Sequence, residues 1–374
     1  MSWSLVPLHD VCRPKQWKTI ASSKLLDEGF PVYGANGIIG FYDEYTHELP
    51  TLMITCRGAT CGNVHISKPK SYINGNAMAL DSLDHDKVDI RYLYYFFKSR
   101  GFKDVISGSA QPQITGQGLT KVQIPLPPLG EQKRIAAILD KADAIRQKRK
   151  QAIDLADEFL RSVFLDMFGD PVTNPKGWEV KSLFELTKGK LQNGAYFPKD
   201  MYSGDGVEMV HMGDAFYDYI PRGKMKRVIA NDKEIQKYKV TTDDILISRR
   251  SLNYEGAAKP SLIIDDKEPL LFESSLIRLT PNSDVLNKLY LFGYLSNEIV
   301  KEHKIRKFVT GATIKGISQK NLENIEILVP PIDLQTKYEG VVSGISKLKR
   351  KIENEDRLAT LFSSLSQRAF SSEL

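Results

Sequence analysis

The chain has 374 residues, of which 26% are charged, and a formal net charge of +6 at pH 7. No apolar run approaches the ~18 to 20 residues that a membrane-spanning helix needs, and the first residues lack the basic and apolar segments of an export signal, which predicts a cytoplasmic protein. The 3 cysteines all lie in the first half and are too few for a disulfide framework. The mild positive charge permits a polyanionic partner without requiring one.

The sequence contains an internal repeat. Residues 124–129 (IPLPPL), followed by Gln132, return as residues 327–332 (ILVPPI), followed by Gln335, at an offset of 203 residues. Each copy comes at the end of a globular stretch and precedes a long helical pattern. A duplicated unit of this size, without a catalytic signature in either copy, predicts two similar recognition domains held by one chain.

A long helix is predicted after each Pro-Pro pair, over residues 129–168 and over residues 332–370. Apolar and small side chains recur every three or four residues on both, which is typical of a coiled-coil seam. At about 1.5 Å per residue, ~40 residues form a rod of roughly 60 Å, which we interpret as a spacer. The predicted seam contains Ile135, Ile138, Ala142, Ile145 and Phe159 in the first helix and Tyr338, Val341, Ile345, Leu348 and Phe362 in the second.

The residues outside these helices predict two globular domains with a shared plan. Buried strands are expected over 51–55, 244–248 and 261–264, and matching aromatic-rich helices over 92–97 and 290–295. The predicted fold class is α+β, with two mixed α/β domains in tandem repeat and two long helices. The predicted divisions are 1–128 for the first domain, 129–168 for the central helix, 169–177 for a linker with Gly and Pro, 178–331 for the second domain and 332–374 for the C-terminal helix.

Packing of the two helices against each other would constrain the domains. An antiparallel coiled coil converts the direct repeat into a pseudo-two-fold arrangement with one domain at each end of the rod. Dimeric DNA-binding proteins use this symmetry to read half-sites about one helical turn, ~34 Å, apart. Dense basic runs at residues 146–150 and 347–351 would then meet near the pseudo-dyad and face phosphates or an acidic partner, although the solvated face of a helix is the more ordinary explanation.

The polar loops differ between the two predicted domains. The first domain has CRGATCGN at residues 56–63, where the second has RRSLNYEG at 249–256, and a glycine-rich turn at 33–40 and loops at 107–113 and 310–315 offer close backbone approach. Arginine and amide side chains suit contacts with guanine and adenine edges, so different loops on one scaffold predict two different half-sites, while plain surface variation explains any single residue equally well. The candidate DNA-binding residues are Tyr33, Asn36, Arg57, Asn63, Gln111 and Gln113 in the first domain and Gln192, Asn193, Arg249, Arg250, Asn253, Tyr254 and Lys315 in the second.

Signatures of catalysis are weak. The run Asp265-Asp266-Lys267 follows a predicted strand and could serve a metal-dependent nuclease, but carboxylates there usually belong to a turn. The Pro-Pro pairs lack the amide and aromatic residues with which methyltransferases hold a flipped base. Cys56, Cys61 and His65 do not have the spacing of a zinc site. We predict no catalytic residue and no metal site, and keep a self-contained nuclease or methyltransferase and a coiled-coil scaffold without DNA contact as alternatives.

With these motifs in place, the chain resembles the specificity subunits of type I restriction-modification systems. The resemblance rests on YGANGIIGF at 33–41, IPLPPLGEQKRIAAIL at 124–139, the linker at 168–178 and the segment 361–374, which contains QRAF. The second helix start departs from the pattern, because Asp333-Leu334 replaces the Gly-Glu pair. The resemblance implies two target-recognition domains that read one bipartite, asymmetric DNA sequence and an antiparallel coiled coil that sets its spacer.

The resemblance also implies the partners. The chain would be a non-catalytic subunit that binds double-stranded DNA and two modification subunits, which methylate adenine with S-adenosylmethionine. Through that complex it would recruit restriction subunits that use ATP and Mg. No cofactor is expected in this chain itself. Individual base contacts do not follow from the resemblance, because recognition domains are where such proteins differ most.

Overall fold

The protein is described here by a computed structural model that defines residues 3–108, 111–354, 364–365 and 367–371. The chain folds into two compact units: unit 1 comprises residues 1–151 together with 352–374, and unit 2 comprises residues 152–351. Both divisions fall within the long helices, so each unit contains part of a helix that continues into the other.

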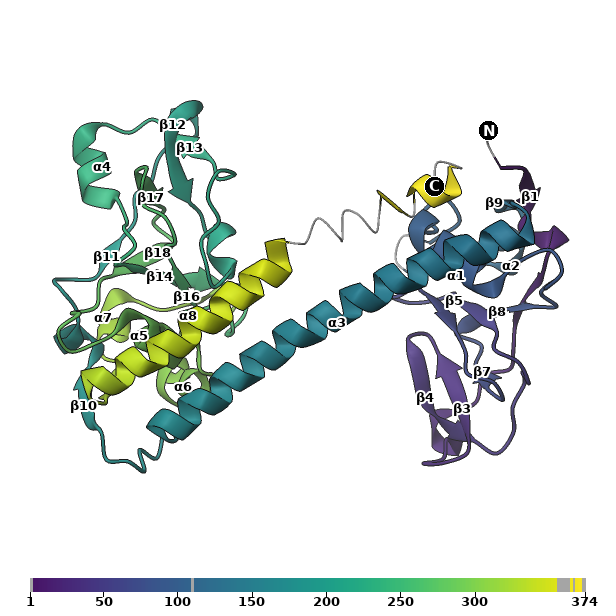
Figure 1. The fold of residues 1–374 in the computed structure, drawn as a ribbon, viewed down its shortest axis with the longest axis horizontal. Coiled ribbons are helices and arrows are strands. Elements are labelled where there is room, and N and C mark those ends of the chain that lie inside the picture. Colours follow the sequence, from purple (N-terminus) through teal and green to yellow (C-terminus); the bar gives the residue numbers. More distant parts are fainter. Residues whose placement is uncertain (1–2, 109–110, 355–363, 366, 372–374) are drawn as a thin grey trace. The chain divides into compact units, whose positions relative to one another are not determined.

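Unit 1 is built on two small sheets and a strand pair (Figure 1). Its strands are β1 (Leu5–Pro7), β2 (Arg13–Gln16), β3 (Phe30–Gly34), β4 (Gly37–Tyr42), β5 (Leu52–Thr55), β6 (Val64–Ile66), β7 (Tyr72–Ile73), β8 (Ala77–Asp81) and β9 (Gln123–Pro125). Its helices are α1 (Ile90–Arg100), α2 (Gly116–Thr120), the first part of α3 (Leu129–Phe168) and the 3-10 turns η1 (Leu8–Asp10) and η2 (Ser22–Lys24). The sheets have strand orders β2-β8-β5-β6 and β4-β3-β7, and β1 pairs with β9.

Unit 2 repeats this plan. Its strands are β10 (Glu179–Ser182), β11 (Gln192–Asn193), β12 (Tyr202–Val210), β13 (Arg227–Val228), β14 (Ile245–Ser248), β15 (Arg250–Ser251), β16 (Pro260–Leu262), β17 (Leu270–Phe272), β18 (Leu276–Leu279), β19 (Lys315–Gly316) and β20 (Glu326–Val329). Its helices are α4 (Asp232–Tyr238), α5 (Lys288–Ser296), α6 (Glu298–Val300), α7 (Gln319–Glu323), most of α8 (Ile332–Asn354), the π-helix η6 (Lys301–Ile305) and the 3-10 turns η3 (Leu183–Leu186), η4 (Lys199–Met201), η5 (Asp214–Phe216) and η7 (Arg306–Phe308).

The sheets of the two units correspond strand by strand. The order β11-β18-β14-β16 matches the four-stranded sheet of unit 1, and β13-β12-β17 matches its three-stranded sheet. In both three-stranded sheets one outer pair is antiparallel and the other is parallel. The pair β10–β20 matches β1–β9, and unit 2 has an additional pair, β15–β19.

The repeated glutamines are buried clasps between each long helix and its own domain. Gln132 Oε1 accepts from the backbone N of Asp89 at 2.8 Å, and Gln132 Nε2 donates to the backbone O of Lys87 and Pro127. Gln335 makes the same three bonds to Asn287, Val285 and Pro330. Asp89 and Asn287 are also the N-caps of α1 and α5. The repeated sequence motif therefore fixes the start of each long helix against the start of a domain helix.

A tryptophan hydrogen bond is a second feature that the two units share. In unit 2, Trp178 Nε1 donates to the backbone O of Phe168, the last residue of α3, at 2.8 Å. In unit 1, Trp3 Nε1 donates to the backbone O of Ala369 at 3.3 Å. The neighbouring Phe370 packs edge-on against Tyr92 of α1, and the C-terminal residues lie beside this helix in Figure 1. The end of α3 thus completes the core of unit 2, and the helical segment that contains Ala369 completes the core of unit 1.

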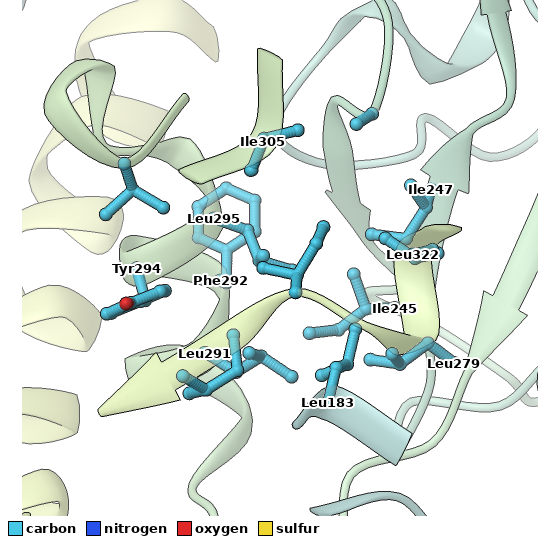
Figure 2. Packing of buried hydrophobic residues seen from close by; sticks show 14 of the residues in the cluster. Leu183, Ile245, Ile247, Leu279, Leu291, Phe292, Tyr294, Leu295, Ile305 and Leu322 are labelled. Atoms are coloured by element: carbon cyan, nitrogen blue, oxygen red, sulfur yellow. The ribbon is translucent and has the colours of Figure 1, made fainter. Parts of the chain in front are cut away.

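The main core of unit 2 lies between the four-stranded sheet and α5 (Figure 2). Ile245 and Ile247 of β14 and Leu279 of β18 pack with Leu291 of α5 and Leu322 of α7, and all five are buried. In unit 1 the equivalent core contains residues from β5, β8, α1, α2 and α3. The predicted strands and aromatic helices therefore form the core as expected, except that the third predicted strand ends at residue 262, two residues earlier than predicted.

The first predicted long helix is confirmed over its full range, residues 129–168. The second is confirmed as α8 up to residue 354, and residues 364–365 and 367–370 are also helical. The helices run antiparallel inside unit 2, because Phe168 at the end of α3 touches Tyr338 near the start of α8, whereas the earlier Asp157 pairs with the later Lys349 at 2.7 Å. None of the described helices combines the length and apolar character that a bilayer crossing requires.

Candidate nucleic-acid interface

In unit 1, backbone hydrogen bonds join the two loops that the sequence singled out, residues 56–63 and 107–113. Arg57 forms an antiparallel bridge with Gln113. Gln113 and Ser107 exchange two backbone hydrogen bonds of 2.9 Å, which closes the second loop. The side chains of Arg57 and Gln113 are both exposed. The two loops therefore form one paired surface at this end of unit 1.

The hairpin β3–β4 joins the same surface. The hydroxyl of Thr55, at the end of β5, donates to the backbone O of Ala35 in the hairpin turn. Across the gap, Asn63 Nδ2 donates to Asn36 Oδ1 at 3.5 Å, and both amides are exposed. Polar side chains from three separate segments thus converge at one edge of unit 1. Gln111 lies exposed on the same loop as Gln113.

In unit 2 the corresponding loops pair in the same way. The strands β15 and β19 place Arg250 opposite Gly316 and Ser251 opposite Lys315. Gly316 and Thr310 exchange backbone hydrogen bonds of 2.8 and 2.9 Å, which closes the second loop as in unit 1. This closure occurs 203 residues after its counterpart, the offset of the sequence repeat. The surface on which base contacts were predicted is therefore a repeated structural feature.

A glycine makes the closed loop possible in both units. Gly108 has φ +83° and Gly311 has φ +108°, conformations that disfavour other residues. A Cβ at Gly108 would lie 2.6 Å from the backbone O of Gln111, and one at Gly311 would lie 2.0 Å from the backbone O of Ile314. Any side chain at either position would clash with the backbone of the closed loop.

Tyr33 is a scaffold residue in this structure. Its ring is buried with Met53 and Ile73, and its hydroxyl accepts a hydrogen bond from the backbone N of Lys68 at 3.1 Å. The ring is 7% exposed, which leaves no face on which a base could stack. Among the candidates of unit 1, the exposed side chains are Asn36, Arg57, Asn63, Gln111 and Gln113.

Two candidates of unit 2, Gln192 and Arg249, are held by neighbours within the fold. Gln192 Nε2 donates to the backbone O of Lys237 at 3.0 Å, and Gln192 Oε1 accepts from the guanidinium of Arg278. Asn193 Oδ1 is buried and has no hydrogen-bond partner among the residues that the structure describes. Arg249 is half-buried and its guanidinium donates to the backbone O of Ser274 at 3.3 Å. Arg250 is the exposed member of the arginine pair.

Asn253 braces the loop at residues 249–256. Its Oδ1 accepts from the hydroxyl of Ser251 and from the backbone N of Gly256, each at 3.0 Å. On the other side of the loop, the ammonium of Lys301 in the π-helix donates to the backbone O of Glu255 at 2.8 Å. Burial, together with the nearby Lys259, lowers the pKa of Lys301. These bonds give the loop a fixed shape before any ligand is present.

Tyr254 lies between two cations. The guanidinium of Arg306 is 4.8 Å from the centre of its ring and the ammonium of Lys315 is 4.7 Å from it. Lys315 also donates to the backbone O of Gly311 and Ala312, so it stabilises its own loop. Arg306 forms an ion pair with Glu302 at 2.6 Å. Sequence reasoning missed Arg306, although the basic run KEHKIRK at 301–307 could have indicated it.

The acidic pair that suggested a nuclease caps turns. Asp266 Oδ2 accepts from the backbone N of Thr242 at 3.0 Å and from its hydroxyl at 3.1 Å, and these bonds lower the pKa of Asp266. Asp265 Oδ1 accepts from the backbone N of Lys267 at 2.9 Å. Both carboxylates therefore have local structural roles. Within the described ranges, no group of three or more His, Cys, Asp or Glu side chains is placed to hold a metal ion.

The model of one protein family, the type I restriction modification DNA specificity domain, matches residues 2–155 and 175–361. The chain belongs to this family. The specificity subunit of the type I restriction enzyme MjaIX from Methanocaldococcus jannaschii is 24% identical over 343 residues, which cover 83% of this chain and 74% of the relative. A putative specificity subunit from Haemophilus influenzae, S.HindORF215P, is 24% identical over 349 residues, which cover 90% and 85%.

The crystal structure of a type I restriction-modification S subunit from M. genitalium has the same fold. It aligns with a TM-score of 0.65 at 16% sequence identity and covers 99% of this chain and 96% of that one. The predicted α+β fold class, with two mixed recognition domains in tandem and two long helices, is confirmed. The resemblance to specificity subunits, inferred from the sequence motifs, is confirmed as well.

The predicted coiled-coil residues of this specificity subunit differ in exposure. Ile135 and Tyr338 are buried in their own units, and Ile138, Ala142, Val341 and Ile345 are half-buried. Ile145, Phe159 and Leu348 are 47%, 51% and 50% exposed. Phe362 lies outside the described residues. Ile135 and Tyr338 belong to the cores of unit 1 and unit 2, so they pack their helices onto the domains. The exposed three are apolar residues on the surfaces of the helices.

Proposed function

We propose that this chain is the sequence-specific DNA-recognition subunit of a type I restriction-modification complex and reads a bipartite, asymmetric target. Each unit would read one half of the target with its paired loops. One observation carries the proposal: the two units share their scaffold down to single hydrogen bonds, but they present different exposed side chains at the same place. Membership of the specificity family supports it. A scaffold without DNA contact gives no reason for two such loop sets.

The proposed division of the chain follows the sequence repeat. Residues 1–128 and 178–331 would be the recognition domains, joined by the linker at 169–177, and residues 129–168 and 332–374 would be the spacer helices. The exposed apolar residues of these helices, such as Phe159 and Leu348, would contact modification subunits. One modification subunit per half-site gives two in the complex.

The chemistry would belong to those partners. The modification subunits would use S-adenosylmethionine to methylate adenine, and restriction subunits would use ATP and Mg to cleave. This chain would be non-catalytic and would act in the cytoplasm, where the chromosome lies. The turn-capping roles of Asp265 and Asp266 support this division of labour, because they occupy the carboxylates that had suggested a nuclease.

Single-molecule sequencing of DNA tests the proposal directly. The chain would be expressed with its modification subunit in a host that lacks other adenine methyltransferases, and N6-methyladenine would be mapped. We expect methylation at one asymmetric motif with two defined parts and a fixed spacer. Methylation without a motif, from a partner that is active beside another specificity chain, would reject the proposal.

A helix insertion tests the spacer. Adding one heptad to the exposed part of α3 near Lys148 should change the number of unread base pairs and leave both half-sites unaltered. The same sequencing experiment gives the readout. Altered half-sites with an unchanged spacer would contradict the role of the helices.

A further inference from the structure

An exposed aliphatic pair lies at the tip of the paired loops in unit 2. The β15–β19 register runs from Arg250 opposite Gly316 to Ser251 opposite Lys315, so the next facing positions are Leu252 and Ile314. Leu252 is 80% exposed and Ile314 is 53% exposed. Single exposed apolar residues are common, but Leu252 and Ile314 both adjoin the last pair of this register, one on each loop.

The loops hold this pair in a fixed position. Leu252 lies between Ser251 and Asn253, whose side chains are hydrogen-bonded to each other at 3.0 Å. The loop that carries Ile314 is closed by Lys315, whose ammonium donates to the backbone O of Gly311 and Ala312. A leucine at the tip of such a braced loop cannot fold back onto the core. It is held ready for a ligand, which reduces the entropy lost on binding.

Cationic side chains neighbour the aliphatic pair in these loops. Arg250 is exposed and lies two residues before Leu252, and Arg306 and Lys315 flank the ring of Tyr254, two residues after Leu252. Cations beside small apolar side chains fit the surface of duplex DNA, where phosphates border the grooves and the base edges lie between them.

Unit 1 has different chemistry at the same place. There Gly58 donates its backbone N to the backbone O of Pro112, so the next facing positions are Ala59 and Gln111. Both are exposed, and Gln111 offers an amide where unit 2 has Ile314. Amides read base edges by hydrogen bonds, as with adenine, whereas aliphatic side chains have no donor or acceptor. The two units therefore present different chemistry at equivalent positions.

We infer that Leu252 and Ile314 contact the 5-methyl group of thymine in the half-site read by unit 2. This methyl is the one aliphatic group that the base edges present in the major groove. The inference rests on the proposed function, under which every half-site that contains a target adenine also contains a thymine opposite to it. Leu252 and Ile314 would act as specificity-determining residues.

Deoxyuridine tests the inference, because it removes only the methyl group. Duplexes that carry the sequenced target would have each thymine of one half-site replaced in turn, and binding by the complex with the modification subunit would be measured. We expect a loss of about fourfold in affinity at one or more positions of the half-site read by unit 2, the effect of one methyl group leaving an apolar contact. The half-site is identified as the one whose recognition changes in Arg250→Ala.

Matched variants assign the effect to these residues. The double variant Leu252→Ala, Ile314→Ala should bind thymine and deoxyuridine duplexes equally, while Gln111→Ala, the matched change in unit 1, should keep the full deoxyuridine penalty. The inference is overturned if the wild-type complex ignores deoxyuridine throughout that half-site or if the double variant retains the penalty. It is also overturned if the double variant only loses its modification subunit, since the pair would then be a protein contact. Failure of the proposed function looks different, because then no target motif is found at all.

Discussion

Unit 1 and unit 2 agree where the backbone must be held and differ where side chains reach solvent. The glutamine clasps, the tryptophan bonds to helix ends and the closed loops at Gly108 and Gly311 recur in both. The side chains at the loop tips do not recur. The shared features all involve hydrogen bonds or close contacts to backbone groups, which every residue has. The scaffold therefore tolerates different side chains at the tips of its loops.

One difference between the units is a segment inserted after the start of α5. Tyr290 of unit 2 is equivalent to Tyr92 and lies 198 residues after it, whereas Thr310 is equivalent to Ser107 and lies 203 residues after it. The stretch between these two positions is therefore five residues longer in unit 2. Unit 2 accommodates the addition with α6 and the π-helix η6, which supply Lys301 and precede Arg306. Insertions into helices often produce π-helical turns near functional sites. The added segment braces the loop at residues 249–256 through the bond from Lys301 to Glu255.

The largest expected effect comes from breaking one clasp and sparing the other. Gln335→Leu would leave buried backbone groups of Asn287, Val285 and Pro330 without partners, at a cost of about 3 to 5 kcal/mol in the stability of unit 2. Hydrogen exchange should rise in α5 and remain unchanged in α1. Gln132→Leu should give the reverse pattern.

The exposed Gln117→Leu in α2 is the control for the clasp variants, and exchange should stay as in the wild type. Equal loosening of both units by either clasp variant would show that the units fold as one cooperative body.

A smaller effect is expected at the two exposed arginines of the paired loops, Arg57 and Arg250. Arg250→Ala should weaken or relax recognition of one half-site, and Arg57→Ala should do the same to the other, by about 1 to 3 kcal/mol per lost base contact. Methylation sequencing of each variant gives the readout. Uniform weakening on all DNA sequences would show that the arginine touches phosphate only.

Arg249 gives a contrast to its neighbour. Its guanidinium is bonded to the backbone of Ser274, so Arg249→Ala should disturb the loop as a whole. We expect lower affinity on the cognate target without a new base preference at any single position. A clean change of one base would instead make Arg249 a direct reader.

Tyr290→Phe should cost about 1 kcal/mol near neutral pH, because the hydroxyl donates a buried hydrogen bond to the backbone O of Leu328 at 2.8 Å. Burial raises the pKa of Tyr290 well above its usual 10.0. The unfolded chain therefore loses this proton first, and the stability of the fold should fall as pH rises above about 10, by about 1.4 kcal/mol per pH unit for each such tyrosine.

Urea unfolding between pH 8 and 11 checks this slope. The variant should be less stable than the wild type at pH 8 and should lose stability less steeply above pH 10. Tyr92→Phe is the matched change in unit 1, where the hydroxyl donates to the backbone O of Pro125 at 2.9 Å. Parallel curves for wild type and variant would show that the hydroxyl ionises in the folded protein as it does in water.

The smallest effect is expected at Arg306. Arg306→Gln removes one cation near the proposed DNA-binding loops and should weaken binding similarly on all sequences, lowering the slope of log affinity against log salt by about 1. Binding titrations between 50 and 200 mM salt would measure it. Lys233→Gln in α4 is the control, because this exposed lysine belongs to another element of unit 2. A change in sequence preference would make Arg306 a base contact.

Local signals in the sequence predicted the helices well. The Pro-Pro pair before residue 129 and the Gly169 after residue 168 define a helix by its own start and stop chemistry, and the structure agrees with both ends. The equivalence of the two loop pairs followed from the repeat. These features depend on neighbours in the chain, which a single sequence displays.

Contacts between residues that are distant in the chain could not be predicted from the sequence. The repeated Gln132 was recognised as part of a motif, but its partners lie more than forty residues earlier in sequence at Asp89 and Lys87. Tyr33 read as a surface residue of a glycine-rich turn, whereas the parallel pairing of β3 with β7 buries it. The pairing of β3 with another strand decides which of its side chains face the core. The local sequence pattern does not show which strands pair. The roles of the exposed loop residues stay predictions for the same reason.

The bond from Trp3 to Ala369 links residues that are 366 positions apart in the sequence. A ribosome makes Trp3 long before Ala369, and Ala369 is fully buried in the core of unit 1. Unit 1 can therefore be completed only after all of unit 2 has been translated, whereas unit 2 already has the end of α3 when its own residues emerge. A nonsense mutation between codons 352 and 369 would leave unit 2 whole and damage unit 1.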